Sequence, residues 1–399
     1  MKKFLRRLGG GFLCLGLAAG TVFADPMHVS PTDEKSIISG TEKTIVETPD
    51  GEVVEEEKSY WQRIEWGLIV DGIVQGNTGS SASWESQTDA VYGLDLEALF
   101  PAGEKGSFYM KLEAGGGEGL DGRIPTFSGF NDHAWGPSDG IEFTEVWYQH
   151  KFLDGHFRGI VGKFDLTNEF DTNQYANCEH EQFLSSGFIN NLATEFPDNS
   201  FGGMFFWEPS ERFTVGLGVQ NNSGWDDVLH NVFAILEIGW HPVFNCHQGN
   251  YRFFGWTSSH SAFEDEEGVL SEAFTNRGWG LSFDQEITHH FGIWGRYSQQ
   301  CNEDFNDIKA HASCGFQFMN FYWRPDDTFG VAYGLAQITD AMRDSLENAG
   351  DESHIEIYYR CVLRDFFAVT PNVQWVKNPG GNADEEEVFV LGLRGTFSM

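Results

Sequence analysis

Positive charge is scarce in this chain of 399 residues, which carries 25 Lys+Arg against 60 Asp+Glu and a formal net charge of −35. A protein that binds nucleic acid needs clustered Lys and Arg to neutralise phosphates, so nucleic acid is excluded as a natural partner. Proline is also scarce, at 12, whereas glycine (47) and phenylalanine (36) are abundant. Helical enzymes of this length rely on Ala, Leu, Glu and Lys, so this composition argues against one.

Long apolar runs are absent as well. Beyond residue 24 we find no run of about 18 apolar residues, so no transmembrane helix is expected. A shorter apolar run, Phe12–Phe23, follows a basic start at residues 2–7. Ala24 then supplies the small residue that signal peptidase requires. We interpret residues 1–24 as a cleaved signal peptide and expect the chain to be exported.

Cysteines are few and show no pairing pattern. Five follow the signal peptide: Cys178, Cys246, Cys301, Cys314 and Cys361. An odd, scattered set is no disulfide framework, and it offers no Cys-x-x-Cys pair for zinc. Unpaired thiols packed as small apolar groups are the simpler interpretation, while one disulfide in an oxidising periplasm stays open.

Motifs for catalysis and for cofactors are missing too. There is no Gly-x-Ser-x-Gly elbow, no His-Glu-x-x-His motif and no Gly-rich phosphate loop, so we predict no enzyme and no cofactor. The cluster Glu179-His180-Glu181 could contact a metal ion, but adjacent residues rarely converge on one ion. We therefore predict no metal site.

What the chain does have is a repeated pattern of strands about ten residues long. Residues 25–60 are polar and acidic, and we expect a flexible or short helical lead-in on the periplasmic side. Residues 61–399 show no linker and no shift in composition, which indicates one domain. The pattern predicts sixteen strands: Trp61–Asn77, Val91–Phe100, Ser107–Gly115, Ile141–Phe152, Phe157–Lys163, Phe201–Trp207, Phe213–Gln220, Val232–Trp240, Tyr251–Thr257, Gly278–Glu286, Phe291–Ser298, Ser313–Trp323, Phe329–Ile338, His354–Leu363, Phe366–Val376 and Val388–Phe397.

The connections between these strands alternate between short and long. Short periplasmic turns and long outside loops are typical of a bacterial outer-membrane barrel. We therefore predict an all-β fold, a closed transmembrane antiparallel β-barrel of 16 strands. The alternative is a soluble secreted sandwich or solenoid, in which the same alternation separates a core from water. Sandwich strands are nearer five or six residues, which favours the barrel.

Alternation within the strands assigns a lipid face and a lumen face. We predict that Leu94, Leu96, Leu236, Ile357 and Leu393 face lipid. The intervening positions, which carry charge and glycine, then face the lumen. Aromatic residues at strand ends fit interfacial girdles: Trp66, Phe100, Trp207, Trp240, Trp323 and Trp375.

A barrel of sixteen strands encloses water, so selectivity requires something that narrows the lumen. The connection Asp165–Asn199 is the longest in the chain and is predicted to fold inward. The predicted constriction comprises Lys163, Asp165 and Asp171 near the root of this loop, and Glu145, Trp147, Arg296, Glu356 and Arg360 opposite. Sugar hydroxyls donate and accept hydrogen bonds, so these charges, with Trp147 as an aromatic plate, suit a carbohydrate. The alternative for each residue is a solvated lumen wall, and the alternative location for the constriction is the Gly116–Gly140 loop.

Particular residues carry a resemblance to a known family. The loop contains Gly162-Lys163-Phe164-Asp165, Asn168-Glu169-Phe170-Asp171-Thr172-Asn173, Tyr175-Ala176-Asn177, Gln182-Phe183-Leu184 and Asn190-Asn191. This stretch resembles the long inward-folding loop of OprB-type carbohydrate-selective porins. The end of the chain is similar again, with Glu356-Ile357-Tyr358-Tyr359-Arg360, Thr370-Pro371, Asn378-Pro379-Gly380-Gly381-Asn382 and Gly392-Leu393-Arg394.

The resemblance covers residues 61–399 and implies a sixteen-stranded barrel in the outer membrane of a Gram-negative bacterium. Its implied activity is passive, selective diffusion of monosaccharides and small oligosaccharides. The implied partners are outer-membrane lipid and carbohydrate solutes, with the protein a monomer or homotrimer. The heavy acidity leaves open a general or cation-preferring porin. A barrel that acts as an enzyme or anchor is a further alternative.

Overall fold

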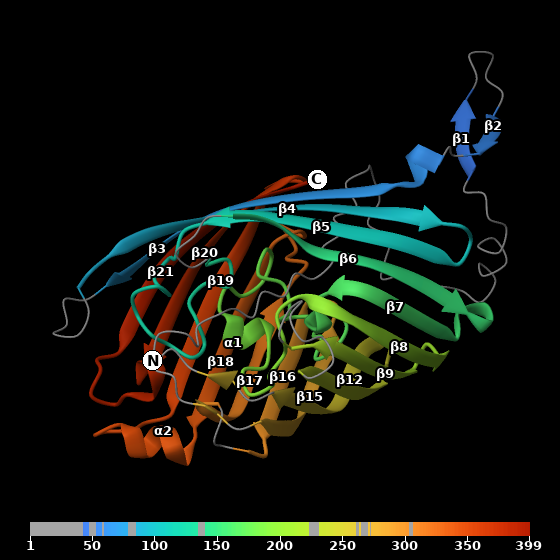
Figure 1. Ribbon diagram of the computed structural model, residues 1–399. Coiled ribbons are helices and arrows are strands. Elements are labelled where there is room, and N and C mark those ends of the chain that lie inside the picture. Colours follow the sequence, from blue (N-terminus) through green and yellow to red (C-terminus); the bar gives the residue numbers. More distant parts are fainter. Residues whose placement is uncertain are drawn as a thin grey trace.

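The computed structural model describes residues 43–47, 53–57, 60–78, 85–134, 140–222, 231–260, 263–264, 270–271, 273–302 and 306–399. The signal peptide predicted at residues 1–24 lies outside these ranges. Within the described residues, sixteen long antiparallel strands close into one barrel, which confirms the predicted fold class (Figure 1).

The first half of the wall contains eight strands: β3 (Glu65–Thr78), β4 (Thr88–Ala102), β5 (Gly106–Gly116), β6 (Gly140–Phe152), β7 (Phe157–Phe164), β8 (Ser200–Ser210), β9 (Phe213–Asn221) and β10 (Val232–Trp240). The second half contains β12 (His247–His260), β15 (Phe274–Thr288), β16 (Phe291–Gln300), β17 (Ile308–Phe318), β18 (Thr328–Ile338), β19 (Glu352–Arg364), β20 (Phe367–Lys377) and β21 (Val388–Ser398). The last strand pairs with the first, Leu391 opposite Gly76, and this pairing closes the barrel.

Short elements lie in the connections. They are η2 (Tyr60–Arg63), η3 (Leu153–Gly155), η4 (Leu166–Asn168), α1 (Ser186–Ile189), β11 (Val243–Phe244), β13 (Phe263–Glu264), β14 (Leu270–Ser271), α2 (Asp340–Ser345) and η5 (Pro379–Gly381). In the lead-in, β1 (Lys43–Glu47) and β2 (Val53–Glu57) pair as a separate two-stranded sheet. Of the two expectations for the lead-in, flexible or short helical, the helical one is therefore wrong for these ten residues. None of the described helices is long and apolar enough to cross a membrane.

One predicted strand is misplaced. The sequence predicts Ser313–Trp323, whereas β17 begins five residues earlier, at Ile308, and ends at Phe318. The aromatic run Phe321–Trp323 imitates a strand end, but Asn320 has a φ of +54° and turns the chain. Trp323 is 80% exposed in that turn. It therefore fits an interfacial position just beyond the wall.

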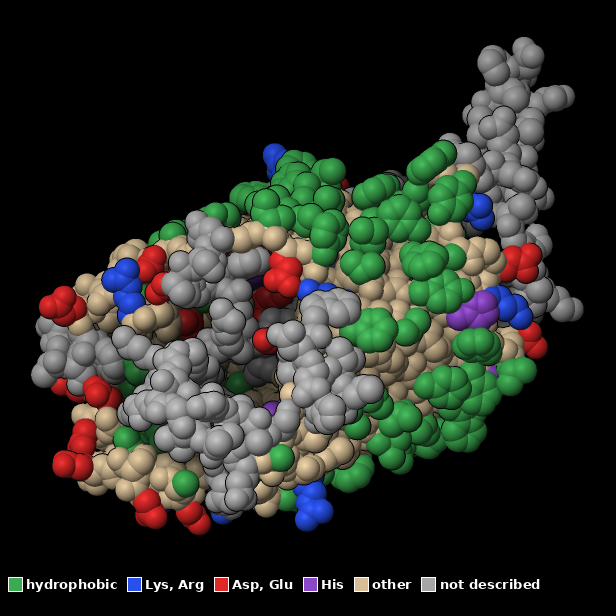
Figure 2. Space-filling view, viewed as in Figure 1, with side chains coloured by type: hydrophobic (Ala, Val, Ile, Leu, Met, Phe, Trp, Pro, Cys, Tyr) green, Lys and Arg blue, Asp and Glu red, His purple; other side chains and the backbone are tan. Residues whose placement is uncertain are grey.

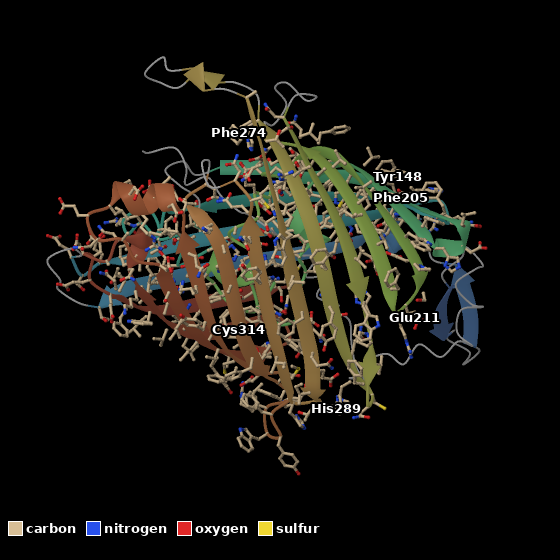
Figure 3. The ribbon with its side chains drawn as sticks, turned by 90° about the horizontal axis from the view of Figure 1, so that it is seen from below. Tyr148, Phe205, Glu211, Phe274, His289 and Cys314 are labelled. Carbon is tan, nitrogen blue, oxygen red and sulfur yellow. The ribbon has the colours of Figure 1, made fainter. Side chains whose placement is uncertain are left out.

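The two faces of the wall follow the predicted alternation. Leu96, Leu236, Ile357 and Leu393 are among the exposed large hydrophobic residues of the outer face, and Leu94 is half-buried on it. Figure 2 shows hydrophobic side chains over much of the outer wall on one side, with most acidic side chains toward its ends. In Figure 3, Tyr148 and Phe205 lie on the outer side of the wall. A one-residue slip would reverse these faces, so the register is correct.

No disulfide links the five cysteines after residue 24, all of which the structure describes. Cys178 lies buried in the lumen, while Cys246, Cys301 and Cys314 are exposed. The interpretation of the thiols as packed small apolar groups is therefore wrong for Cys246, Cys301 and Cys314.

Two long connections fold into the barrel. We call residues 117–134, between β5 and β6, inner loop A, and residues 165–199, between β7 and β8, inner loop B. Both loops contain many buried side chains, and α1 of inner loop B lies inside the ring of strands in Figure 1. Buried loops must satisfy their backbone polar groups, and the lumen wall supplies the partners.

Candidate pore constriction

Inner loop B packs on an aromatic part of the lumen wall. Leu166, Phe170 and Phe196 of the loop join one buried apolar cluster with the inward side chains of four strands, β7, β8, β10 and β12. Those wall residues are Ile160, Phe164, Met204, Phe206, Phe233, Ile235, Phe254 and Trp256. The rings of Phe170 and Phe206 stack at 5.5 Å between centroids. This part of the lumen is therefore an apolar seat rather than a charged, solvated wall.

The middle of inner loop B occupies a second seat. Tyr175, Phe183 and Phe188 pack with Trp294 of β16 and Tyr358 of β19. Gly292 lies directly under Tyr175, where a Cβ atom would come within 2.1 Å of the ring. Small residues in the wall thus make room for the aromatic residues of the loop.

Inner loop A crosses to the far side of the lumen. Glu352 of β19 accepts the backbone N–H groups of Phe127 and Ser128, both at 2.9 Å. The carbonyl of Phe130 accepts bonds from Gln75 and Gln374, on β3 and β20. The sequence named this loop only as the alternative location of the constriction. Since its anchors lie between 55 and 244 positions away along the chain, no local pattern could have revealed them.

The two loops also hold each other. The Asp132 N–H donates to the carbonyl of Leu184, and the Gly187 N–H donates to the carbonyl of Ser128. The Ser185 hydroxyl donates to the same Ser128 carbonyl at 2.7 Å. They form one body inside the lumen, so the narrowing predicted for inner loop B is shared.

Arg296 is the central anchor of inner loop B. Its guanidinium group donates to the carbonyls of Asp171, Ala176 and Phe188. It also lies 3.3 Å from the Asp171 carboxylate. The side chain is completely buried. Arg296 and Asp171 are thus brought together as predicted, but beneath the loop rather than facing a solute.

Glu356 plays the same part three strands further along the wall, on β19. Its carboxylate accepts the N–H groups of Leu184 and Ser185 at 2.9 and 3.0 Å. The residue has no exposed surface. It fixes the point at which inner loop B turns towards α1.

Asp165 and Glu145 stabilise the root of inner loop B. The Asp165 carboxylate accepts the Thr167 N–H and hydroxyl, which caps η4. Burial raises the pKa of Asp165 to about 7 against the effect of those bonds. Glu145 accepts bonds from Asn168 of the loop and from the indole N–H of Trp147. Trp147 in turn stacks on Tyr109, with ring centroids 4.8 Å apart.

Lys163 does not face the lumen, so the prediction is wrong for this residue. It pairs with Val146 and Phe201, whose side chains are exposed on the outer face. Its ammonium group reaches Glu142 at 2.7 Å and the carbonyl of Phe143 at 2.8 Å. Lys163 is the last-but-one residue of β7, where a long side chain can reach past the apolar band.

Three arginines inside the lumen remain partly exposed. Arg360, which was predicted, pairs with Glu181 of inner loop B at 2.9 Å. Arg158 binds Glu169 through both terminal nitrogens, at 2.6 and 2.7 Å, and its guanidinium carbon lies 4.1 Å from the Phe206 ring centroid. Arg252 pairs with Asp284 at 3.2 Å. Arg158 and Arg252 were not predicted as site residues, although alternation with Ile160 and Phe254 places both on the inner face.

A closed wall with loops packed inside it defines the class: a porin-type barrel of the bacterial outer membrane. A family model described as "Carbohydrate-selective porin, OprB family" matches residues 80–399. The chain belongs to the OprB family of carbohydrate-selective porins. The protein is therefore a channel of the Gram-negative outer membrane.

Individual relatives agree with this assignment. Porin B of Pseudomonas aeruginosa is 20% identical over 316 residues, with 65% of this chain and 68% of that protein covered. A structure of Pseudomonas putida OprB at high pH has a TM-score of 0.73 at 19% identity, covering 84% of this chain and 94% of that one. A low-pH structure of the same protein has a TM-score of 0.56 at 16% identity, covering 84% of this chain and 92% of that one. These likenesses support the fold.

Proposed function

We propose that this channel passes monosaccharides and small oligosaccharides through the space that the two inner loops leave open. The observation that carries the proposal is the set of three partly exposed guanidinium groups, Arg158, Arg252 and Arg360. Each is paired with a carboxylate. Such pairs offer donors and acceptors side by side, as sugar hydroxyls require.

Each of these three arginines lies in the half of its strand that leads to a short turn. Arg158 and Arg252 lie near the beginnings of β7 and β12, and Arg360 lies near the end of β19. Those strand ends adjoin the short turns, which are periplasmic in this class of barrel. A solute that has passed the loops would therefore meet the three pairs before it leaves.

The predicted constriction residues have a different part in this proposal. Asp165, Asp171, Arg296 and Glu356 are each at most 3% exposed. They set the position of inner loop B and thereby the width of the passage, whereas Arg360 contacts the solute. Trp147 serves as support for the loop root through Tyr109 rather than as an open plate.

Sugar block of ion current in planar bilayers tests the proposal. Glucose and maltose should reduce the current through the wild-type channel. The changes Arg158→Gln and Arg252→Gln should weaken that block several-fold without changing the barrel's circular dichroism spectrum. Arg212→Gln, in the exposed β8–β9 turn, is the matched control. Equal block in all variants would place sugar binding elsewhere.

A cation-preferring channel is the second candidate, since the chain carries a net charge of −35. Reversal potentials in a salt gradient measure this preference directly. A strong cation preference without any block by sugars would favour this second function over the first.

A further inference from the structure

The strongest unexplained feature is a group of buried side chains where both inner loops meet β3. Asp71 comes from β3, His133 from inner loop A and His180 from inner loop B. Their side chains are 1%, 8% and 2% exposed. One potential ligand atom from each lies within 4.8 Å of the others.

The geometry points several atoms at one place. The Asp71 Oδ2 atom lies 2.6 Å from His180 Nδ1 and 3.5 Å from His133 Nε2. His133 Nε2 has no hydrogen-bond partner, although the residue is more than nine-tenths buried. A buried, unpartnered ring nitrogen is costly unless something binds it.

Neighbouring side chains position these atoms, as the side chains around metal ligands commonly do. The Thr396 hydroxyl donates to the second oxygen of Asp71. His180 Nε2 faces Asp95 Oδ2 at 3.3 Å and Glu179 Oε1 at 3.5 Å. Imidazoles that bind metals usually donate their other N–H to a carboxylate, which fixes the tautomer.

Acidic side chains surround the group. Asp71, Asp95 and Glu179 all approach the His180 ring, at 2.6, 3.3 and 3.5 Å. Lys111 already binds Asp95 and the partly exposed Glu113, at 2.9 and 2.6 Å. A metal cation held by Asp71 and the two imidazoles would be attracted by these neighbouring carboxylates.

We propose that Asp71, His133 and His180 bind one divalent first-row transition ion, with Zn²⁺ as the best match, and that this ion ties both inner loops to β3. Two imidazoles and one carboxylate suit zinc rather than magnesium or calcium. Tetrahedral zinc spaces its ligand atoms about 3.3 Å apart. The 3.5 Å separation already fits, and the 2.6 Å hydrogen bond must open by less than about 1 Å.

The test must first remove a second group that could bind zinc. Among the described residues, His247 and His289 both contact Glu286, at 3.2 and 2.8 Å. Figure 3 labels His289 at the end of the wall strands. All measurements therefore use the full chain with His247→Ala and His289→Ala, which leaves the buried group intact.

This background protein, refolded in detergent after EDTA treatment, should bind one Zn²⁺ ion per chain in calorimetry. Adding Asp71→Asn or His133→Ala should weaken zinc binding by more than about tenfold, the loss that even an outer-shell change causes. The exposed His156→Ala is the matched control and should change nothing.

Co²⁺ supplies a second readout that reports ligand geometry in folded protein. The background protein should give the visible absorption bands of four-coordinate cobalt, and His133→Gln should lose them. No stoichiometric zinc in the background protein would overturn the proposal. So would equal binding in a folded His133 variant, because protons alone would then neutralise the carboxylates.

Discussion

Two parts of the lumen wall hold inner loop B in different ways. On β7 to β12 the wall packs Phe170 and Phe196 against inward aromatic side chains. On β16, β19 and β21 aromatic contacts are joined by buried charged groups that hold the loop backbone, with Arg394 donating to the carbonyl of Gln182 and Glu356 accepting two N–H groups. The apolar contacts stabilise the loop on the wall but do not fix its exact position, since burial of apolar area is non-directional. The hydrogen bonds to the charged groups fix the position of the loop, because hydrogen bonds have a preferred geometry.

The difference also explains why the lumen of this barrel is not uniformly polar. A lumen wall meets water only where no loop covers it. Where inner loop B lies on the wall, the inner face of β10 reads as a protein core, with Phe233 and Ile235 at most 1% exposed. The outer face of the same strand carries Leu236 and Ile238, which face lipid.

The largest effect should come from breaking the apolar side. Phe170→Ala removes a ring with no exposed surface, and changes of this kind cost about 3–5 kcal/mol. Because the barrel itself stays closed, we expect the loop to loosen and single-channel conductance to rise. Phe205→Ala, on the outer face, is the control. Equal conductance in both variants would mean that the aromatic seat does not hold the loop.

The outer face gives the next largest effect. Leu236→Arg places a charge on the lipid face of β10, at a cost of about 2–4 kcal/mol at the bilayer midplane. We expect this variant to refold poorly into detergent or liposomes. Circular dichroism measures the extent of refolding. Glu211→Arg, in an exposed turn, should refold normally. Normal refolding of Leu236→Arg would contradict the assignment of faces on this strand.

The charged side should respond to a change that keeps the charge. Arg296→Lys retains a cation beside Asp171. The compact ammonium group of lysine cannot reach the three carbonyls that the planar guanidinium group binds. Buried carbonyls that lose their donors cost about 1–3 kcal/mol each. We expect larger current fluctuations with a folded barrel, measured in bilayers. A recording as quiet as the wild type would show that the position of the loop does not depend on this fork.

A smaller effect should appear as a dependence on pH. The pKa of Asp165 is raised to about 7 by burial, so its contribution to stability is present at low pH and is lost as pH rises towards 7. Lys111 and Glu113 also act on this carboxyl. Asp165→Asn keeps the cap and stays neutral.

The variant should therefore unfold at a higher temperature than the wild type at pH 8 and at the same temperature near pH 3, below the ordinary carboxyl pKa of 3.8. Thermal melts at both pH values make the comparison. Identical differences at the two pH values would exclude the Asp165 carboxyl as the titrating group.

The wall was predictable because its signal is local. Alternation such as Leu236 beside Glu237 predicts which residues face lipid and which face the lumen. The spacing of the turns predicts the number of strands. The ends of β17 were not predictable, because the aromatic run Phe321–Trp323 satisfies a strand pattern while lying in a turn.

For the site residues, only the inner or outer face of the wall could be predicted, from the alternation along each strand. Alternation places Arg296 and Glu356 on the inner face, but it cannot say that a loop more than 100 residues away buries them. Alternation places Lys163 on the outer face of β7. Its charge and its position beside the root of inner loop B nevertheless suggested a lumen residue. The length of inner loop A marked it as the alternative constriction, but nothing local predicts that Glu352 holds it, since their contact is purely tertiary.

Liposome swelling with sugars of increasing size tests the two-loop constriction most directly. Wild-type protein should admit glucose readily and slow down steeply from disaccharide to trisaccharide. A variant with residues 171–196 replaced by a short Gly-Ser linker should admit all three at similar rates. If that variant folds and keeps the wild-type size dependence, inner loop B does not set the width of the passage.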